Sequence, residues 1–192
     1  FKTFFLSELK YTLRQPLVYV FIVIFALMEF FPMITDEVRI GSAIGNFHRN
    51  APFVLAQHIT TLCLLALVMA VMFFNKAALR DYEYEFHEIL FSTPLRKSGY
   101  FFGRFFAALL VATLPLLGVF IGMIMGTYLN SIFGWMDRDH FGPFNVEMFL
   151  NNYLLFILPN MFLVGAIIYA MANKWKSTII SFMGPLVIIV AY

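Results

Sequence analysis

The stretch NKAALRDYEYEFHEILFSTPLRKSGYFFGR, residues 75 to 104, separates two long apolar runs and carries nine of the chain's 24 Lys, Arg, Asp and Glu residues. Four of its apolar residues recur at steps of three and four, as on one face of a helix: Leu79, Tyr82, Phe86 and Ile89. The pattern predicts an amphipathic helix beside a membrane. We expect it to end near Phe91, and Thr93 and Pro94 to begin the next helix as N-cap and first residue.

The composition of the whole chain is that of a membrane protein. Of its 192 residues, 61% are hydrophobic and 12% are charged, whereas soluble domains have roughly 25% charged residues. We therefore predict an all-α, polytopic membrane protein in contact with a lipid bilayer. The formal net charge of +2 is too small to indicate a nucleic-acid partner. The single cysteine, Cys63, excludes an internal disulfide.

Long apolar runs predict one transmembrane domain over residues 1–192 with about five spans. The last run has 14 residues, and about 20 are needed to cross a bilayer. We therefore expect the chain to be a fragment whose complete domain has six spans. Pro115 and Pro159 interrupt the third and fourth runs. The expected spans are residues 17–34, 56–74, 100–128, 149–172 and 179–192, with residues 75–99 as a cytoplasmic segment.

The first 16 residues predict an amphipathic helix that ends at Pro16 and lies in the membrane interface. Its apolar face is formed by Phe1, Phe5, Leu9 and Leu13. The opposite face carries Thr3, Ser7, Lys10 and Arg14. Lysine and arginine at this depth are expected to lie near lipid phosphates.

The distribution of Lys and Arg predicts the orientation of the spans. The side that holds the amino-terminal helix and residues 75–104 and 173–177 has ten of them. The other side has three: Arg39, Arg49 and Arg138. Because positive charge accumulates on the cytoplasmic side, the amino terminus and residues 75–99 are predicted to be cytoplasmic.

Two polar residues inside the predicted spans are candidates for a translocation path. An ionised Glu29 in the first span is costly unless it is paired or hydrated, so it could bind substrate or relay protons. Alternatively, the span ends early and Glu29 reaches the external interface. Asn160, next to Pro159, could line a cavity or could bond to carbonyls that the proline leaves free.

Small residues spaced by four predict a groove along the third span. Gly118, Gly122 and Gly126 form one such row, and Gly99, Gly103 and Ala107 form another. Such rows let a second helix approach closely. We expect them to serve in helix packing, and sliding during transport is the alternative.

No catalytic or metal-binding motif is complete in the sequence. His87 and Glu88 begin like the zinc-protease pattern H-E-x-x-H, but Phe91 stands where the second histidine is needed. No phosphate-binding loop G-x-x-x-x-G-K-[ST] occurs. The other histidines, His48, His58 and His140, are expected to be structural or exposed. We predict no enzymatic activity, catalytic residue or metal site in this region.

The order of elements resembles the type-2 permeases of ATP-binding-cassette transporters. FKTFFLSELKYTLRQP at residues 1–16 resembles their interfacial elbow helix, and RDYEYEFHEILFSTPLRKSGYFFGRF at 80–105 resembles their coupling segment. Three shorter phrases look like the bacterial permeases fused to a gluzincin-type aminopeptidase domain: NAPFVLA at 50–56, FGPF at 141–144 and LPNMFLVGAIIYAMA at 158–172. In those permeases the peptidase lies beyond the region present here.

The resemblance implies an exporter subunit in the bacterial cytoplasmic membrane. Its partners would be a cytoplasmic ATPase, which holds ATP and Mg²⁺, and a second permease half; this chain itself would hold no cofactor. The residues expected to couple to the ATPase are Arg80, Asp81, Glu83, Glu85, Glu88, Arg96 and Lys97. The alternatives are a membrane scaffold, or an ion-coupled secondary transporter that uses Glu29, for which a second buried charge is missing from the sequence pattern.

Overall fold

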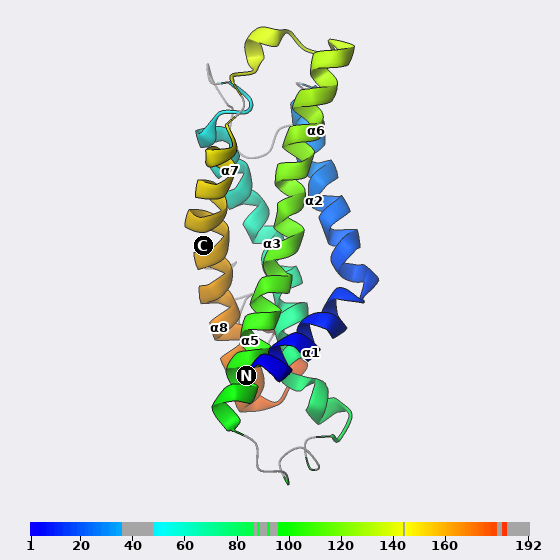
Figure 1. The fold of residues 1–192 in the computed structure, drawn as a ribbon, viewed down its shortest axis with the longest axis vertical. Coiled ribbons are helices and arrows are strands. Elements are labelled where there is room, and N and C mark those ends of the chain that lie inside the picture. The colour runs from blue at the N-terminus through cyan, green and yellow to red at the C-terminus, as the bar shows by residue number, and fades with distance from the viewer. Residues whose placement is uncertain are drawn as a thin grey trace. The chain divides into compact units, whose positions relative to one another are not determined.

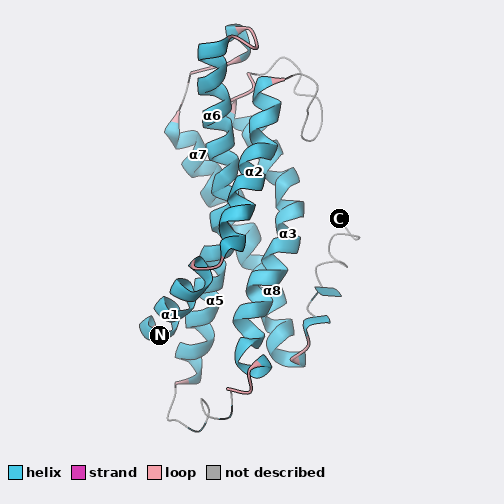
Figure 2. Cartoon of the chain, turned by 90° about the vertical axis from the view of Figure 1, so that its right-hand side faces the viewer, coloured by secondary structure: helices cyan, strands magenta, loops and turns pink. Residues whose placement is uncertain are grey.

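The structure is a computed structural model that describes residues 1–35, 48–86, 88, 92, 96–143, 145–179 and 182–183. These residues form helices and connecting loops, without a strand among them (Figure 2). The all-α prediction is therefore confirmed for this part of the chain. Most of the predicted fifth span, residues 179–192, lies outside the described residues.

The helices follow one another along the chain with short 3₁₀ and π segments between some of them (Figure 1). In order they are α1 (Lys2–Leu13), α2 (Pro16–Ile34), α3 (Pro52–Glu83), α5 (Lys97–Thr113), η1 (Leu114–Leu116), α6 (Leu117–Phe133), η2 (Arg138–His140), α7 (Val146–Asn152), η3 (Tyr153–Ile157) and α8 (Leu158–Trp175).

Four of the described helical segments are long and apolar enough to cross a membrane. Their most apolar windows have mean hydropathies of 2.2 to 2.5. Each contains one of the first four predicted spans, which supports the assignment as a membrane protein. The segments are Pro16–Ile34, Pro52–Glu83, Lys97–Phe133 and Val146–Trp175.

Pro115 and Pro159, two of the prolines within these spans, lie at local changes of helix type and do not end the helical path. Pro115 lies in η1, a single 3₁₀ turn between α5 and α6. Pro159 has no N–H to donate to a carbonyl in the preceding turn, and the π segment η3 immediately precedes α8 there. Such changes are common where proline interrupts the normal hydrogen-bond ladder.

The amphipathic helix predicted after the second span is interrupted at residues 84–86. α3 continues without a break to Glu83, and a turn over residues 84–86 follows. Glu85 has a φ of 55°, a left-handed conformation that a continuing helix cannot contain. Phe86 is exposed and not part of an apolar face. The remaining predicted residues, His87, Ile89, Phe91, Thr93 and Pro94, lie outside the described part of the chain.

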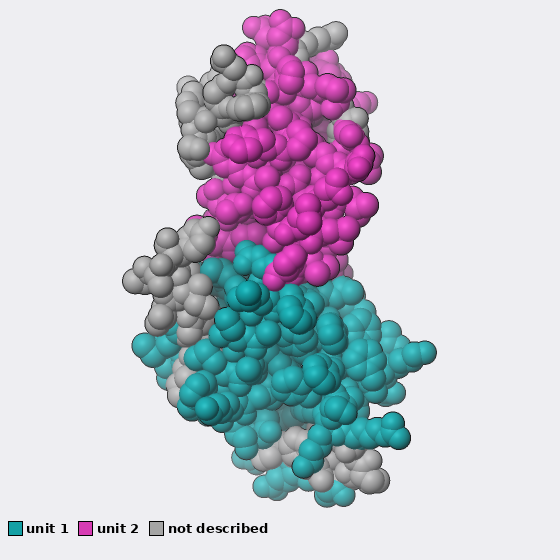
Figure 3. Space-filling view, turned by 90° about the vertical axis from the view of Figure 1, so that its left-hand side faces the viewer, with its two compact units in different colours: residues 1–16, 66–112, 160–192 teal, residues 17–65, 113–159 magenta. Residues whose placement is uncertain are grey.

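The chain forms two compact units (Figure 3). Unit 1 comprises Phe1–Pro16, Ala66–Ala112 and Asn160–Tyr192, and unit 2 comprises Leu17–Leu65 and Thr113–Pro159. Each unit contains segments that are distant in sequence, and α3 contributes residues to both.

Aromatic rings form much of the core of unit 1. The Phe105 ring lies 5.6 Å from that of Phe74 and 5.5 Å from that of Tyr169, which joins α5 to α3 and α8. A Cβ at Gly165 would overlap the Phe74 ring, so glycine there makes room for the ring. The Tyr169 hydroxyl donates to the Phe101 carbonyl at 3.2 Å.

The glycine row on α6 determines how α2 packs in unit 2. Gly118, Gly122 and Gly126 are all buried. A Cβ at Gly118 would overlap the Ile22 carbonyl, and one at Gly122 would overlap the Ala26 carbonyl. The α2 backbone therefore occupies the space that side chains would otherwise fill, as expected for a small-residue helix interface.

The end of α2 is capped by a side chain from the following loop. Arg49 is buried and donates to the carbonyls of Pro32 and Thr35, the latter at 2.9 Å. These carbonyls lack partners within the helix, and a cation near a helix C-terminus is favourable. Next to it, Asn50 exchanges two 2.7 Å hydrogen bonds with the backbone of Gly142. Arg49 and Asn50, just before α3, are thus fixed within unit 2.

Candidate functional site

In unit 1, α1 packs closely against the first half of α5 (Figures 1 and 2). Two glycines of the second predicted row permit this approach. A Cβ at Gly103 would lie 3.1 Å from the Phe1 carbonyl oxygen, and one at Gly99 would lie 3.2 Å from the Phe1 nitrogen. The groove predicted along the third span therefore packs against two different helices. Gly99 and Gly103 on α5 receive α1 in unit 1, and the glycine row on α6 receives α2 in unit 2.

The inner face of α1 carries a buried carboxylate. Glu8 is 1% exposed, and it lies on the same face as Phe1 and Phe5, seven and three residues earlier. Its Oε2 is 2.8 Å from Nη2 of Arg80 on α3 and 3.3 Å from Nε of Arg104 on α5. One glutamate thus joins three helices.

A second carboxylate completes the connection between α3 and α5. Oδ1 of Asp81 is 2.7 Å from Nη2 of Arg104, and Oδ2 accepts a 2.8 Å hydrogen bond from the Tyr100 hydroxyl. Arg104 also donates to the Tyr100 hydroxyl at 2.8 Å and to the Ala77 carbonyl at 3.2 Å. Asp81, Tyr100 and Arg104 are all buried.

We call Glu8, Arg80, Asp81 and Arg104 the ion cluster. Its two carboxylates and two guanidiniums cancel in formal charge, which a buried site requires because an unpaired charge there is very costly. Burial raises the pKa of the Glu8 carboxyl, and the nearby Arg104 and Arg80 guanidiniums oppose this rise. Because the directional bonds of the cluster come from three helices, they fix α1, α3 and α5 in one arrangement.

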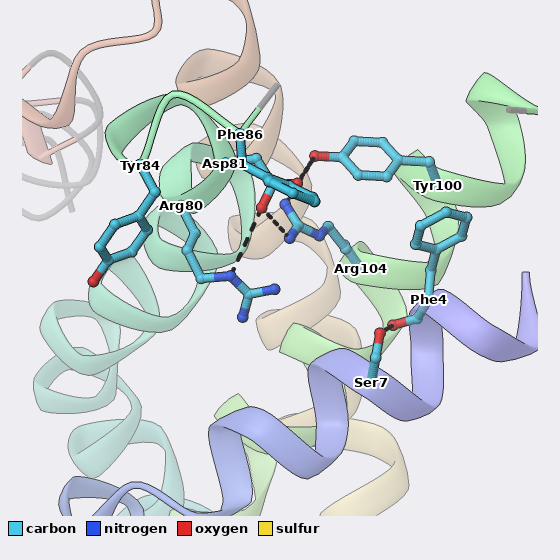
Figure 4. Close-up of a pocket in the computed structure, with 8 residues that line it drawn as sticks. All are labelled: Phe4, Ser7, Arg80, Asp81, Tyr84, Phe86, Tyr100 and Arg104. Carbon is cyan, nitrogen blue, oxygen red and sulfur yellow. Dashed lines mark hydrogen bonds and ion pairs between the residues drawn. The ribbon is translucent and has the colours of Figure 1, made fainter. Parts of the chain in front are cut away.

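A cavity of about 420 Å³ lies beside the ion cluster (Figure 4). Three of the four residues of the ion cluster line it, namely Arg80, Asp81 and Arg104. The cavity reaches the turn that follows α3, since two of its lining residues come from that turn. It is lined by Phe4, Ser7, Arg80, Asp81, Tyr84, Phe86, Tyr100 and Arg104.

The structure divides the residues predicted to couple to a partner into two groups. Arg80 and Asp81 belong to the ion cluster, so their side chains bind other parts of this chain. The prediction that Asp81 contacts a partner is corrected, because Asp81 is buried and its carboxylate already binds Arg104 and Tyr100. The others are exposed: Glu83, Glu85, Glu88, Arg96 and Lys97.

Glu29 is fully buried in unit 2, so its side chain is enclosed by the protein and not exposed on its surface. Its Oε1 lies 2.8 Å from Nδ1 of His58 on α3, and His58 is also fully buried. The second buried ionisable residue, which the sequence pattern did not reveal beside Glu29, is therefore His58. Asn160, the other candidate for a translocation path, is exposed on α8 and belongs to unit 1.

Four residues of these two sites were missed in the sequence: Glu8, His58, Tyr100 and Arg104. Glu8 had a readable signal, because it is an acid on the face of α1 that was assigned as apolar. Arg104 had a weaker one, since it follows the first residues of an apolar run and was counted as part of the loop. The pairing of His58 with Glu29 depends on how α2 and α3 are aligned, which no local pattern reveals.

No metal site is evident in the described residues, where no three His, Cys, Asp or Glu side chains come together as ligands would. The charged side chains of the two sites instead form ion pairs with one another. Comparisons of the chain with family models, curated proteins and solved structures found no match.

Proposed function

We propose that this chain is the transmembrane permease subunit of an ATP-driven exporter. The observation that carries the proposal is the ion cluster, which ties α1 to α3 and α5 close to a group of exposed acids on the segment between them. Such an arrangement suits a site where a partner protein pushes on two membrane spans.

The ion cluster would make this junction stiff. Charge-assisted bonds are stronger and more directional than neutral ones, and buried charges are costly to separate. A displacement of the segment after α3 would therefore move α1, α3 and α5 together. Both Pro52–Glu83 and Lys97–Phe133 run on from the junction as continuous helical segments, so they would carry the movement into the membrane.

The exposed acids supply the contact with a partner. Glu83, Glu85 and Glu88 are exposed and offer carboxylates to basic groups. The excess of Lys and Arg on this side of the spans assigns it to the cytoplasm, where ATP is available. Because no phosphate-binding loop occurs in the chain, ATP and Mg²⁺ would be held by a separate ATPase subunit.

The outer faces of the spans support a place in the bacterial cytoplasmic membrane beside a second permease half. Only 28% of the most apolar window in Pro16–Ile34 and 33% of that in Val146–Trp175 is buried. Large exposed apolar surfaces mark contact with lipid or with another protein. These two spans are therefore the candidate surfaces for lipid and for the second half.

Purification of the full-length protein from its native membrane tests the proposal. An ATPase with a phosphate-binding loop should co-purify, and reconstituted vesicles should show ATP-dependent flux. Abolishing ATP hydrolysis in that ATPase should stop the flux. Flux that is driven by an ion gradient and needs no ATPase would contradict the proposal.

An ion-coupled secondary transporter is the second candidate, and the pair of Glu29 with His58 favours it. Buried ionisable residues in membrane spans commonly mark ion or proton pathways. Flux in vesicles that contain only this protein distinguishes the two. A proton gradient alone would drive it in the second case and not in the first.

A further inference from the structure

We propose that Glu29 and His58 form a binding site for one proton within unit 2. The site holds the proton while α2 and α3 are in contact and releases it when they separate. The role in transport rests on the proposed function, to which the site would add a proton-linked step.

The geometry is that of a closed site with unused bonding capacity. Both side chains are fully buried, and Nδ1 of His58 lies 2.8 Å from Oε1 of Glu29. Oε2 of Glu29 and Nε2 of His58 are buried and have no hydrogen-bond partner among the described residues. Buried polar atoms are usually satisfied, so two orphaned atoms in one pair indicate a site kept for its ionisable groups.

Apart from Glu29, the residues of α2, α3 and α6 in unit 2 include no Asp, Glu, Lys or Arg, so on these helices Glu29 and His58 are each other's charge partners. α6 packs on Glu29 at Gly122, whose added Cβ would lie 3.0 Å from the Glu29 Cβ. α6 contains no Asp, Glu, Lys, Arg or His. Among the described residues between α2 and α3, the one Lys or Arg is Arg49, which caps the end of α2. The other titratable side chains on these elements of unit 2 are Tyr19, Cys63 and Tyr128.

Charge balance fixes the number of protons on the buried pair. With one proton the pair is neutral, either as carboxylate and imidazolium or as carboxylic acid and imidazole. Without a proton it carries one negative charge, and with two it carries one positive charge. A net charge at such a position is expensive, so the buried pair keeps one proton over a wide pH range.

Separated groups behave differently because water stabilises their charges. In water a glutamate titrates near about pH 4.3 and a histidine near about pH 6.5. Above about pH 6.5 the separated pair therefore holds no proton, and separation releases the one that the buried pair held. Each further pH unit favours the separated state about tenfold. Between about pH 4.3 and 6.5 both states hold one proton, and separation is independent of pH.

Reversible unfolding of the full-length protein in mixed micelles tests this, because unfolding separates the pair. Stability is compared over about pH 5 to 9, which spans the histidine titration, for wild type, Glu29→Gln, His58→Gln and the control Glu147→Gln. Glu147 is exposed in the same unit, so its variant should follow wild type. Subtracting the stability of this control from that of each other protein, at each pH, removes the contribution of the groups that titrate in both.

The two variants should change the profile in opposite ways. In wild type the folding equilibrium constant should fall about tenfold per pH unit above about pH 6.5. The reason is that the folded state holds a proton on the pair that the unfolded state lacks. In Glu29→Gln this fall is absent; instead stability rises up to about pH 6.5, since only the unfolded histidine binds a proton.

His58→Gln provides a second test if Glu29→Gln does not fold. In this variant the buried Glu29 keeps a proton that the unfolded glutamate loses near about pH 4.3. Stability should therefore begin to fall near about pH 4.3 and should already fall steeply at about pH 5. Parallel pH profiles for wild type and Glu29→Gln would overturn the proposal. A fall in His58→Gln that still begins near about pH 6.5 would overturn it as well.

Discussion

At the level of single residues, the described part of the protein contains two groups of charged side chains that compensate one another. In unit 1, Glu8 and Asp81 face Arg80 and Arg104, while in unit 2 Glu29 faces His58. Replacing a buried ion group by apolar residues can be harmless, but removing one partner leaves the others uncompensated. The two sites should therefore be far more sensitive to single than to matched double substitutions.

Arg104→Met should lower the free energy of unfolding by about 3 to 5 kcal/mol, because it leaves Glu8 and Asp81 with one fewer cation. Adding Asp81→Asn should recover part of this loss, since the two residues share one network. Unfolding in mixed micelles measures both, with the exposed Arg96→Met as the control. If the double variant loses as much unfolding free energy as the two single substitutions together, the two side chains do not act together.

Some of these charges could be predicted from the sequence and some could not. Glu29 stands alone in an apolar run, and Glu8 interrupts the apolar face of a helix, so each is visible in a local pattern. His58 is not, because its partner is 29 residues away and helical periodicity does not specify which helices pack together. Asp81 was found as part of a charged segment, but its burial depends on Arg104 and Tyr100 of another helix.

At the scale of elements, apolar run length predicted the four described spans because a bilayer sets the number of residues that a helix needs. Helix ends were harder to predict. α3 continues past the expected end of its span because Ala77, Ala78 and Leu79 are buried in unit 1. The periodic pattern beyond them continues in the sequence, but the chain leaves the helix at the left-handed Glu85.

Gly122→Ala should destabilise the protein by about 1 to 3 kcal/mol, as expected for an overpacked interface. The added methyl group would overlap the Ala26 carbonyl, so α2 would have to move. Met125→Leu is the control, because Met125 lies on the same helix with 51% of its surface exposed. Equal thermal stability of the two variants in detergent would show that α2 does not use this groove.

At the scale of the whole molecule, the distribution of Lys and Arg makes a prediction about the two sides of the membrane. Lys97 should be cytoplasmic and Asp139 external, and both side chains are exposed. In a Cys63→Ala background, an impermeant thiol reagent applied to intact cells should label Asp139→Cys and not Lys97→Cys. Labelling at position 97 would reverse the orientation and remove the proposed ATPase contact.

The proposed function requires that exposed acids beside the ion cluster bind a cytoplasmic ATPase. Its most direct test is recovery of the co-purifying ATPase, at physiological salt, by the triple variant Glu83→Lys, Glu85→Lys, Glu88→Lys. A control with the same charge change replaces the exposed Asp137, Asp139 and Glu147 by lysine. Exposed pairs contribute only about 0.2 to 1 kcal/mol each, so all three must be reversed together.

The first variant should bind the ATPase about threefold to a hundredfold more weakly than wild type. Repulsion between like charges would add to this loss. The control variant should recover the ATPase as wild type does. Undiminished recovery by Glu83→Lys, Glu85→Lys, Glu88→Lys, or an equal loss in the control, would contradict the claim.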